Sequence, residues 1–178
     1  MRVLFGVAAA ILLVACSPGI QTNIPESMAK APPKGEATDT TRAANAAVAD
    51  RLPLEDTSDF VDATRGLLAQ LKQDTITDVD GNVVWQVSRR DGDSPDTVNP
   101  SLWRQERLNS EHGLFEVMDG IYQVRGYDLA VMSVIRGDTG WIIVDPLLSQ
   151  ETAAAALGLV NDTLGNRPVT GVIYTHSH

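Results

Sequence analysis

The chain of 178 residues contains one cysteine, Cys16, and three histidines, and only 5% of its residues are aromatic. A single cysteine cannot form a disulfide within the chain, so the fold must depend on an apolar core. Basic residues are also scarce, because 14 lysines and arginines stand against 23 aspartates and glutamates, which gives a formal net charge of −9. We expect no binding to nucleic acid, since phosphate recognition requires a basic face.

The apolar run near the N-terminus covers only residues 3–15, and a membrane-spanning helix needs about 20 residues. The run follows a basic residue and predicts a signal peptide over residues 1–15. It ends in Leu13-Val14-Ala15-Cys16, which resembles a bacterial lipobox and predicts lipidation of Cys16. An ordinary signal peptide with a nearby cysteine and a short hydrophobic N-terminus are the alternatives. By resemblance to enteric lipoproteins, Ser17 favours the outer membrane, so we expect an envelope protein that is lipid-anchored there and faces the periplasm, or is periplasmic.

The next two segments differ in composition. Residues 16–50 are rich in proline, alanine, threonine and charge, which predicts a flexible tether behind the lipidated cysteine. Residues 51–113 carry clearer patterns and form an N-terminal extension. Apolar side chains at helical spacing predict an amphipathic helix over residues 58–72, and residues 76–87 predict a β-hairpin. The Asn99-Pro100 pair predicts the start of a further helix.

Residues 114–178 alternate short apolar runs with turns and contain one longer helix. The helix is predicted over residues 150–164, with Ser149 as its N-cap and Gly165 at its end. A strand over residues 169–174 follows, and open α/β sheets place their functional sites at the carboxyl ends of such strands. Earlier strands are predicted over residues 114–117, 121–124, 129–135 and 141–144.

Two of the three histidines, His176 and His178, follow the last predicted strand. Neutral imidazole is a common zinc ligand, and a catalytic zinc uses about three protein ligands and a water, so the pair supplies two. We expect the other ligands to lie beyond residue 178, and hence that the chain is a fragment of a longer protein. Asp145 ends a neighbouring apolar strand, where its carboxylate can orient a metal ligand. A strand-terminating Asp-Pro turn is the alternative for this residue.

The run from Trp141 to Asp145, the serine-capped helix and the last strand with its two histidines resemble the first half of a metallo-β-lactamase fold. The metal motif of that fold is His-x-His-x-Asp-His. A closer resemblance, over about residues 55–178, is to one branch, the bacterial SDS-type alkyl sulfatases (alkyl/aryl-sulfatases). It rests on the strings Asp96-Thr-Val-Asn-Pro-Ser-Leu-Trp-Arg104, His112-Gly-Leu-Phe-Glu-Val117, Gly120-Ile-Tyr-Gln-Val-Arg-Gly126, Gly137-Asp-Thr-Gly-Trp141 and Tyr174-Thr-His-Ser-His178.

The resemblance implies an α/β protein. Residues 114–178 would form the first half of a metallo-β-lactamase-type αββα sandwich, preceded by a family-specific α/β extension over residues 51–113. It also implies hydrolysis of alkyl sulfate esters at a site with two zinc ions, one of them bound by His176 and His178. The family's remaining ligands and homodimerisation region have no counterpart in the sequence, so we expect these residues alone to be inactive. Another hydrolase on the same fold, or a non-catalytic envelope lipoprotein, are the alternatives.

Overall fold

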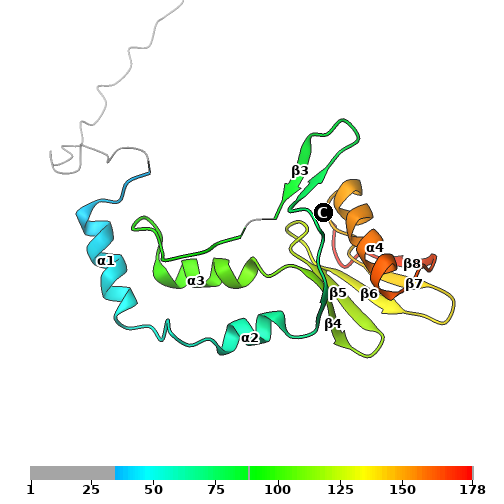
Figure 1. Ribbon diagram of the computed structural model, residues 1–178, viewed down its shortest axis with the longest axis horizontal. Helices are drawn as coiled ribbons and strands as arrows, with labels where there is room; N and C mark the ends of the chain where they lie inside the picture. Colours follow the sequence, from blue (N-terminus) through cyan, green and yellow to red (C-terminus); the bar gives the residue numbers. More distant parts are fainter. Residues whose placement is uncertain (1–34, 88, 178) are drawn as a thin grey trace, which may run out of the picture. The chain divides into compact units, whose positions relative to one another are not determined.

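The computed structural model describes residues 35–87 and 89–177, and Figure 1 shows how their helices and strands are arranged. The predicted signal peptide, Cys16, the first part of the predicted tether and His178 lie outside the described residues. Helices and strands follow one another along the described chain, so the predicted α/β class is confirmed. No helix in this part of the chain is both long and apolar enough to cross a membrane.

A six-stranded sheet carries most of the structure, in the order β1-β4-β5-β6-β7-β8. Neighbouring strands are antiparallel from β1 to β7, and β8 is parallel to β7. Helix α4 (Gln150–Leu164) connects this parallel pair, since parallel neighbours cannot be joined by a tight turn. The strands are β1 (Leu67–Ala69), β4 (Gly113–Met118), β5 (Ile121–Arg125), β6 (Met132–Arg136), β7 (Trp141–Val144) and β8 (Val169–Ile173).

The core lies between the sheet and α4, which covers one face of the sheet (Figure 1). Tyr122, Val134 and Ile143 are aligned across β5, β6 and β7, and all three are buried. Ala156 and Val160 of α4 belong to the same cluster of buried residues. Because successive strand residues point to opposite faces, a slip of one residue would expose this apolar set. The core therefore holds the strands in the register that positions their carboxyl ends.

Helix α4 begins and ends where the sequence predicts. The Ser149 hydroxyl accepts a hydrogen bond from the Thr152 backbone N–H at 3.1 Å, and the Thr152 hydroxyl accepts one from the Ser149 N–H at 3.3 Å. This reciprocal capping box satisfies two backbone donors that the first helical turn leaves unpaired. At the other end, Gly165 has a φ of 97°. The cap holds the loop that leads from β7 into α4.

Residues before the sheet form further elements, several of them predicted. Asn99 caps α3, and its side chain accepts a hydrogen bond from the Ser101 N–H at 3.0 Å. The predicted hairpin is present, with Ile76 paired to Trp85. The elements are α1 (Asp39–Ala49), α2 (Ser58–Thr64), β2 (Thr75–Thr77), β3 (Val83–Gln86) and α3 (Pro100–Asn109).

Part of the predicted tether is helical. Residues 39–49 form α1, and Thr38 caps it by accepting a hydrogen bond from the Thr41 N–H. The Arg42 guanidinium lies 2.9 Å from the Asp96 carboxylate, and the Asn45 side-chain amide donates to the Asp96 carbonyl at 2.8 Å. These contacts tie α1 to the loop that precedes α3. The alanine-rich composition that suggested a tether also favours a helix once a neighbour is available.

The predicted helix over residues 58–72 is wrong in its second half. Helix α2 ends at Thr64, and Gly66 follows with a φ of 78°. The Glu116 N–H donates to the Gly66 carbonyl at 2.8 Å, and β1 then pairs with β4. A Cβ at residue 66 would lie 2.2 Å from the Glu116 carbonyl oxygen, so only glycine fits this approach. Leu67 and Leu68, which fit the helical spacing, belong instead to the edge strand β1.

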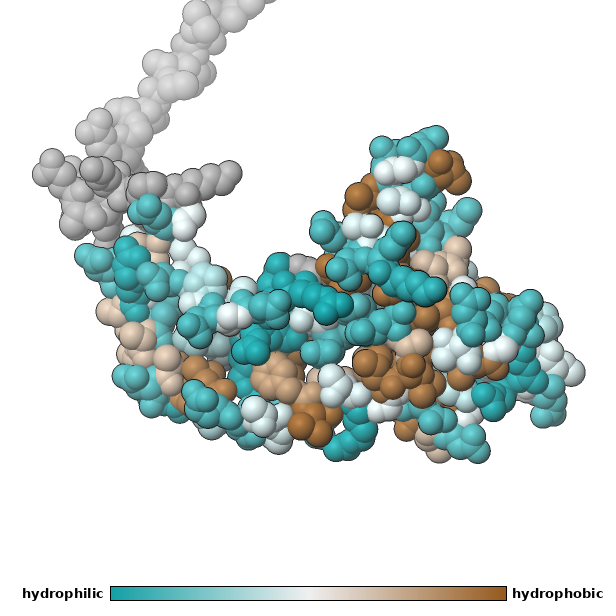
Figure 2. Space-filling view, viewed as in Figure 1, coloured by the Kyte–Doolittle hydropathy of each residue, from teal (hydrophilic) through white to brown (hydrophobic). Residues whose placement is uncertain are grey.

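Apolar side chains also lie on the surface, around β4 and on the β2–β3 hairpin (Figure 2). Leu68 and Val117 are about half exposed near the β1 edge of the sheet. At the other edge, Val172 and Ile173 of β8 are exposed to a similar extent. Both edges of the sheet thus carry apolar side chains that α4 does not cover.

Candidate functional site

Asp145 lies at the carboxyl end of β7, in a strained backbone conformation. Its φ is 53°, and Leu147 in the same loop has a φ of 69°. Non-glycine residues adopt this left-handed conformation rarely, and aspartate is among the residues that tolerate it best. The Asp145 N–H donates to the Ile173 carbonyl at 2.9 Å. The turn therefore begins where the ends of β7 and β8 are joined, and it directs the Asp145 side chain toward the residues after β8.

The Asp145 carboxylate holds Thr175 by two hydrogen bonds. One oxygen accepts from the Thr175 backbone N–H at 2.8 Å, and the other accepts from its hydroxyl at 2.6 Å. The Thr175 Oγ1 also lies 2.8 Å from the Nδ1 atom of His176. The Thr175 hydroxyl is the main cause that holds the pKa of Asp145 below its ordinary value, followed by the Thr175 N–H, with a smaller contribution from His176.

These contacts determine the tautomer of His176. An ionised carboxylate only accepts hydrogen bonds, so the single hydroxyl proton of Thr175 points to Asp145. The hydroxyl oxygen can then only accept from the imidazole, which places a proton on Nδ1 of His176. In the neutral ring, the lone pair consequently resides on Nε2. A metal ligand requires that lone pair, and hydrogen bonding by the other ring nitrogen is the usual way in which it is oriented.

The structure describes one of the two histidines that the sequence predicts as metal ligands. His176 is exposed at the end of β8, where an ion could reach it, and its tautomer fits metal binding through Nε2. Within residues 35–87 and 89–177, no group of three or more His, Cys, Asp or Glu side chains gathers closely enough to hold a metal. His178 lies outside this part of the chain. The assignments of His176 and His178 as ligands, and of Asp145 as their support, therefore stay predictions.

A second carboxylate, Asp128, fixes the loop that carries Asp145. Its side chain is buried, with 8% exposed. One oxygen accepts from the Leu148 N–H at 2.7 Å and from the Thr152 hydroxyl at 2.9 Å, and the other accepts from the Ala130 N–H at 2.6 Å. The β5–β6 loop is thereby tied to the start of α4. Sequence reasoning missed both Asp128 and Thr175, because their roles depend on contacts between distant segments.

The remaining histidine and the tryptophans take no part in this site. His112 is buried, and its Nδ1 lies 3.1 Å from the Ser110 carbonyl. The indole N–H of Trp85 donates to the Gly126 carbonyl, that of Trp103 to the Gly92 carbonyl, and that of Trp141 to the Asn161 side chain. All four side chains therefore have structural contacts.

Comparison with known proteins shows which sequences this chain resembles. The family model described as the metallo-beta-lactamase superfamily matches residues 125–178. The chain is 50% identical over 147 residues to a linear primary-alkylsulfatase of a Pseudomonas species, covering 80% of this chain and 22% of the relative. It is 47% identical over 139 residues to an alkyl/aryl-sulfatase of Saccharomyces cerevisiae, covering 76% of this chain and 22% of the relative.

A solved structure is also similar to the chain, in sequence and in architecture. The stereoselective inverting sec-alkylsulfatase Pisa1 from a Pseudomonas species is 46% identical and superposes with a TM-score of 0.74. The match covers 80% of this chain and 23% of that protein. The chain thus spans about a fifth of the length of the relatives that it matches.

Proposed function

Because this chain is similar to alkylsulfatases and, over residues 125–178, to the metallo-β-lactamase superfamily, we propose that the protein hydrolyses sulfate esters of alcohols. The observation that carries the proposal is the 50% identity to an alkylsulfatase over 147 residues. The residues that match the metallo-beta-lactamase superfamily model, 125–178, include the Asp145–Thr175–His176 chain of hydrogen bonds. Identity at this level over four fifths of the chain favours sulfate esters over the substrates of other hydrolases with this fold.

We propose zinc as the metal, with His176 and His178 as ligands of one of two ions. A neutral imidazole protonated on Nδ1 has the donor atom that zinc prefers, so His176 fits this role. A bound zinc supplies a water of lowered pKa and a positive charge that stabilises the leaving sulfate. The further ligands would come from parts of the protein that this chain does not include.

The residues of this chain orient the site. Asp145 anchors Thr175, and Thr175 fixes the ring of His176 through Nδ1. Asp128 holds the adjoining loop through Leu148 and Thr152. Ligands that are held rigidly before the metal binds lose less conformational freedom, so both carboxylates would raise metal affinity without touching the metal.

The bond that breaks follows from stereochemistry. The relative of known structure is described as inverting, and inversion at a carbon atom requires water to attack that carbon. We propose the same course here: water bonds to carbon, the C–O bond of the ester breaks, and hydrogen sulfate leaves with the ester oxygen. Hydrolysis in heavy-oxygen water would then label the alcohol. Label found in the sulfate would show that the S–O bond breaks instead.

We also propose that Cys16 is lipidated and anchors the protein in the cell envelope, at the outer membrane and facing the periplasm, with homodimers as in the family. The support is the Leu13-Val14-Ala15-Cys16 string and the family resemblance. Cys16→Ser should move the protein from the membrane fraction to the soluble fraction. A wild-type protein that incorporates no fatty-acid label would contradict the anchor.

The function itself is tested with purified protein expressed from its complete gene. Sulfate release from dodecyl sulfate is measured before and after treatment with a chelator, and then after addition of zinc. We expect release that the chelator abolishes and zinc restores. Hydrolysis of a lactam or a lactone with no sulfate release would instead favour another hydrolase of the superfamily, and no hydrolysis of any ester would favour a non-catalytic lipoprotein.

A further inference from the structure

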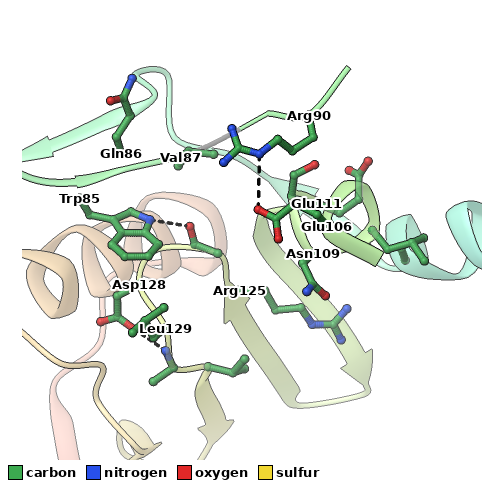
Figure 3. Close-up of a pocket in the computed structure, with 16 residues that line it drawn as sticks. Trp85, Gln86, Val87, Arg90, Glu106, Asn109, Glu111, Arg125, Asp128 and Leu129 are labelled. Atoms are coloured by element: carbon green, nitrogen blue, oxygen red, sulfur yellow. Dashed lines mark hydrogen bonds and ion pairs between the residues drawn. The ribbon is translucent and has the colours of Figure 1, made fainter. Parts of the chain in front are cut away.

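A cleft with a volume of about 680 Å³ opens between the end of the β2–β3 hairpin, the end of α3 and the β5–β6 loop (Figure 3). Its volume lies within the range of about 300–1,000 Å³ that is typical of sites for small molecules. Trp85 and Val87 line it from the hairpin side, Leu108 from α3, and Leu129 and Val131 from the loop. None of these residues takes part in the candidate metal site.

The cleft lies at the same edge of the sheet as that site. The β5–β6 loop leads into β6, whose Ser133 pairs with Val144, the last residue of β7. Val144 in turn pairs with Ile173 at the end of β8. The β5–β6 loop, Asp145 and the residues after β8 therefore all lie at the end of the sheet where β7 and β8 finish. Asp128, which lines the cleft, also accepts the hydrogen bond from Leu148 in the loop after Asp145.

The walls of the cleft include apolar side chains in contact with water. Leu129 is 84% exposed and Val131 is 43% exposed. The Trp85 ring is fixed in place because its N–H donates to the Gly126 carbonyl at 3.0 Å, as Figure 3 shows. Large apolar side chains exposed together around a concave surface are typical of a site that takes apolar groups.

The charges of the cleft do not suit an anion. Three carboxylates, Glu106, Glu111 and Asp128, stand against two guanidiniums, Arg90 and Arg125. Arg90 lies 3.5 Å from Glu106 and is already paired with it, while the Arg125 guanidinium stacks over the Phe115 ring at 4.4 Å. The cleft as a whole is slightly acidic, so the sulfate group of an ester would be repelled from it, and an uncharged group would not.

We propose that this cleft binds the hydrocarbon part of the sulfate ester while the sulfate lies at the metal site. The inference rests on the proposed function and assigns to it a substrate-binding surface made jointly by the N-terminal extension and the β5–β6 loop. The exposed apolar walls give the attraction, and the excess of carboxylates directs the charged end of the substrate away from the cleft and toward the metal. Longer alkyl chains would then bind more tightly.

The test uses Leu129→Asp in the protein expressed from its complete gene. Leu129 is too exposed to support the core, so the variant should keep the thermal transition of the wild type. Val79→Asp is the matched control, since Val79 is fully exposed at the hairpin and does not line the cleft. Val131→Thr, which keeps the shape of the side chain, provides a second, milder variant. KM and kcat are measured for alkyl sulfates from butyl to dodecyl.

Full burial of one methylene group corresponds to about a fourfold gain in binding, and partial burial to less. We expect kcat/KM of the wild type and of Val79→Asp to rise with chain length. The kcat/KM of Leu129→Asp should fall about tenfold or more on dodecyl sulfate, mainly through KM, and about twofold or less on butyl sulfate. Val131→Thr should show a smaller loss that depends on chain length in the same way. An unchanged dependence on chain length in both cleft variants would overturn the proposal. Absence of sulfate release by the wild type would instead overturn the proposed function.

Discussion

The Asp145 carboxylate accepts both the backbone N–H and the hydroxyl of Thr175, at 2.8 and 2.6 Å. The two residues lie 30 positions apart in the sequence and meet because β7 and β8 are parallel neighbours that end at the same edge. The pair connects the sheet to His176, and the orientation of the candidate ligand is therefore a property of the fold.

Replacing Thr175 with valine should weaken metal binding. The variant keeps the shape of the side chain but removes the hydroxyl between Asp145 and His176. Loss of such a supporting hydrogen bond lowers metal affinity by about 10–100-fold. Affinity for zinc would be measured by competition with a chelating dye. Thr163→Val is the control, because the Thr163 hydroxyl donates to the Leu159 carbonyl within α4, away from the site. Equal affinities in the two variants would contradict the role of Thr175.

Replacing Asp128 with asparagine should destabilise the fold. The buried carboxylate accepts three hydrogen bonds, and an amide group would present its NH₂ to at least one of the same donors. An unsatisfied buried polar group costs about 1–3 kcal/mol, so the free energy of unfolding in urea should fall by that amount. Asp138→Asn, at an exposed turn, should leave it unchanged. If the urea midpoint of Asp128→Asn equals that of the wild type, these hydrogen bonds do not stabilise the fold.

Alanine substitutions at two glycines separate backbone strain from steric conflict. Gly66 and Gly81 have similar φ values of 78° and 85°, so both alanines should incur about 1–2 kcal/mol of strain. A Cβ at residue 66 would in addition lie 2.2 Å from the Glu116 carbonyl oxygen, whereas residue 81 has open space. Gly66→Ala should therefore destabilise the protein more than Gly81→Ala in thermal unfolding. Equal losses would mean that β1 is not held against β4 as described.

The contribution of Asp145 to stability should depend on pH. The folded state lowers the pKa of this carboxyl group, chiefly through the Thr175 hydroxyl. A group with a depressed pKa stabilises the fold above its unfolded pKa of about 3.9 and loses this effect as the pH falls through the folded value. The wild type should thus be more stable than Asp145→Asn at neutral pH, and the difference should shrink in acid. Asp119→Asn, at an exposed turn, serves as the control. A stability difference between the wild type and Asp145→Asn that grows in acid would contradict the lowered pKa of Asp145.

Much of the fold could be predicted from local patterns. The strands β5 to β8 show up as short apolar runs between turns, and α4 is delimited by Ser149 and Gly165. Strand β1 could not be predicted, because Leu67 and Leu68 also fit a helical repeat and their partner, β4, is far away in the sequence. Gly66 was the only local indication that the helix ends.

The candidate site could be predicted in part. His176 and Asp145 were identified because each follows an apolar strand and has a side chain suited to metal chemistry. Thr175 and Asp128 were not, since threonine and aspartate are common in turns and nothing local distinguishes these two. Their roles arise from the pairing of β7 with β8 and from the capping of α4, which only the assembled structure brings together.

We propose that His176 binds a metal that the protein needs for sulfate ester hydrolysis. The most direct test of this proposal compares the wild type with His176→Ala and with Ser177→Ala, an exposed neighbour of the histidine, by measuring bound zinc and sulfate release from dodecyl sulfate on the same samples. We predict that His176→Ala loses zinc and most of its activity while it keeps the wild-type unfolding transition. Ser177→Ala should retain both the zinc and the activity. Normal zinc content and near-wild-type turnover in His176→Ala would contradict the proposal.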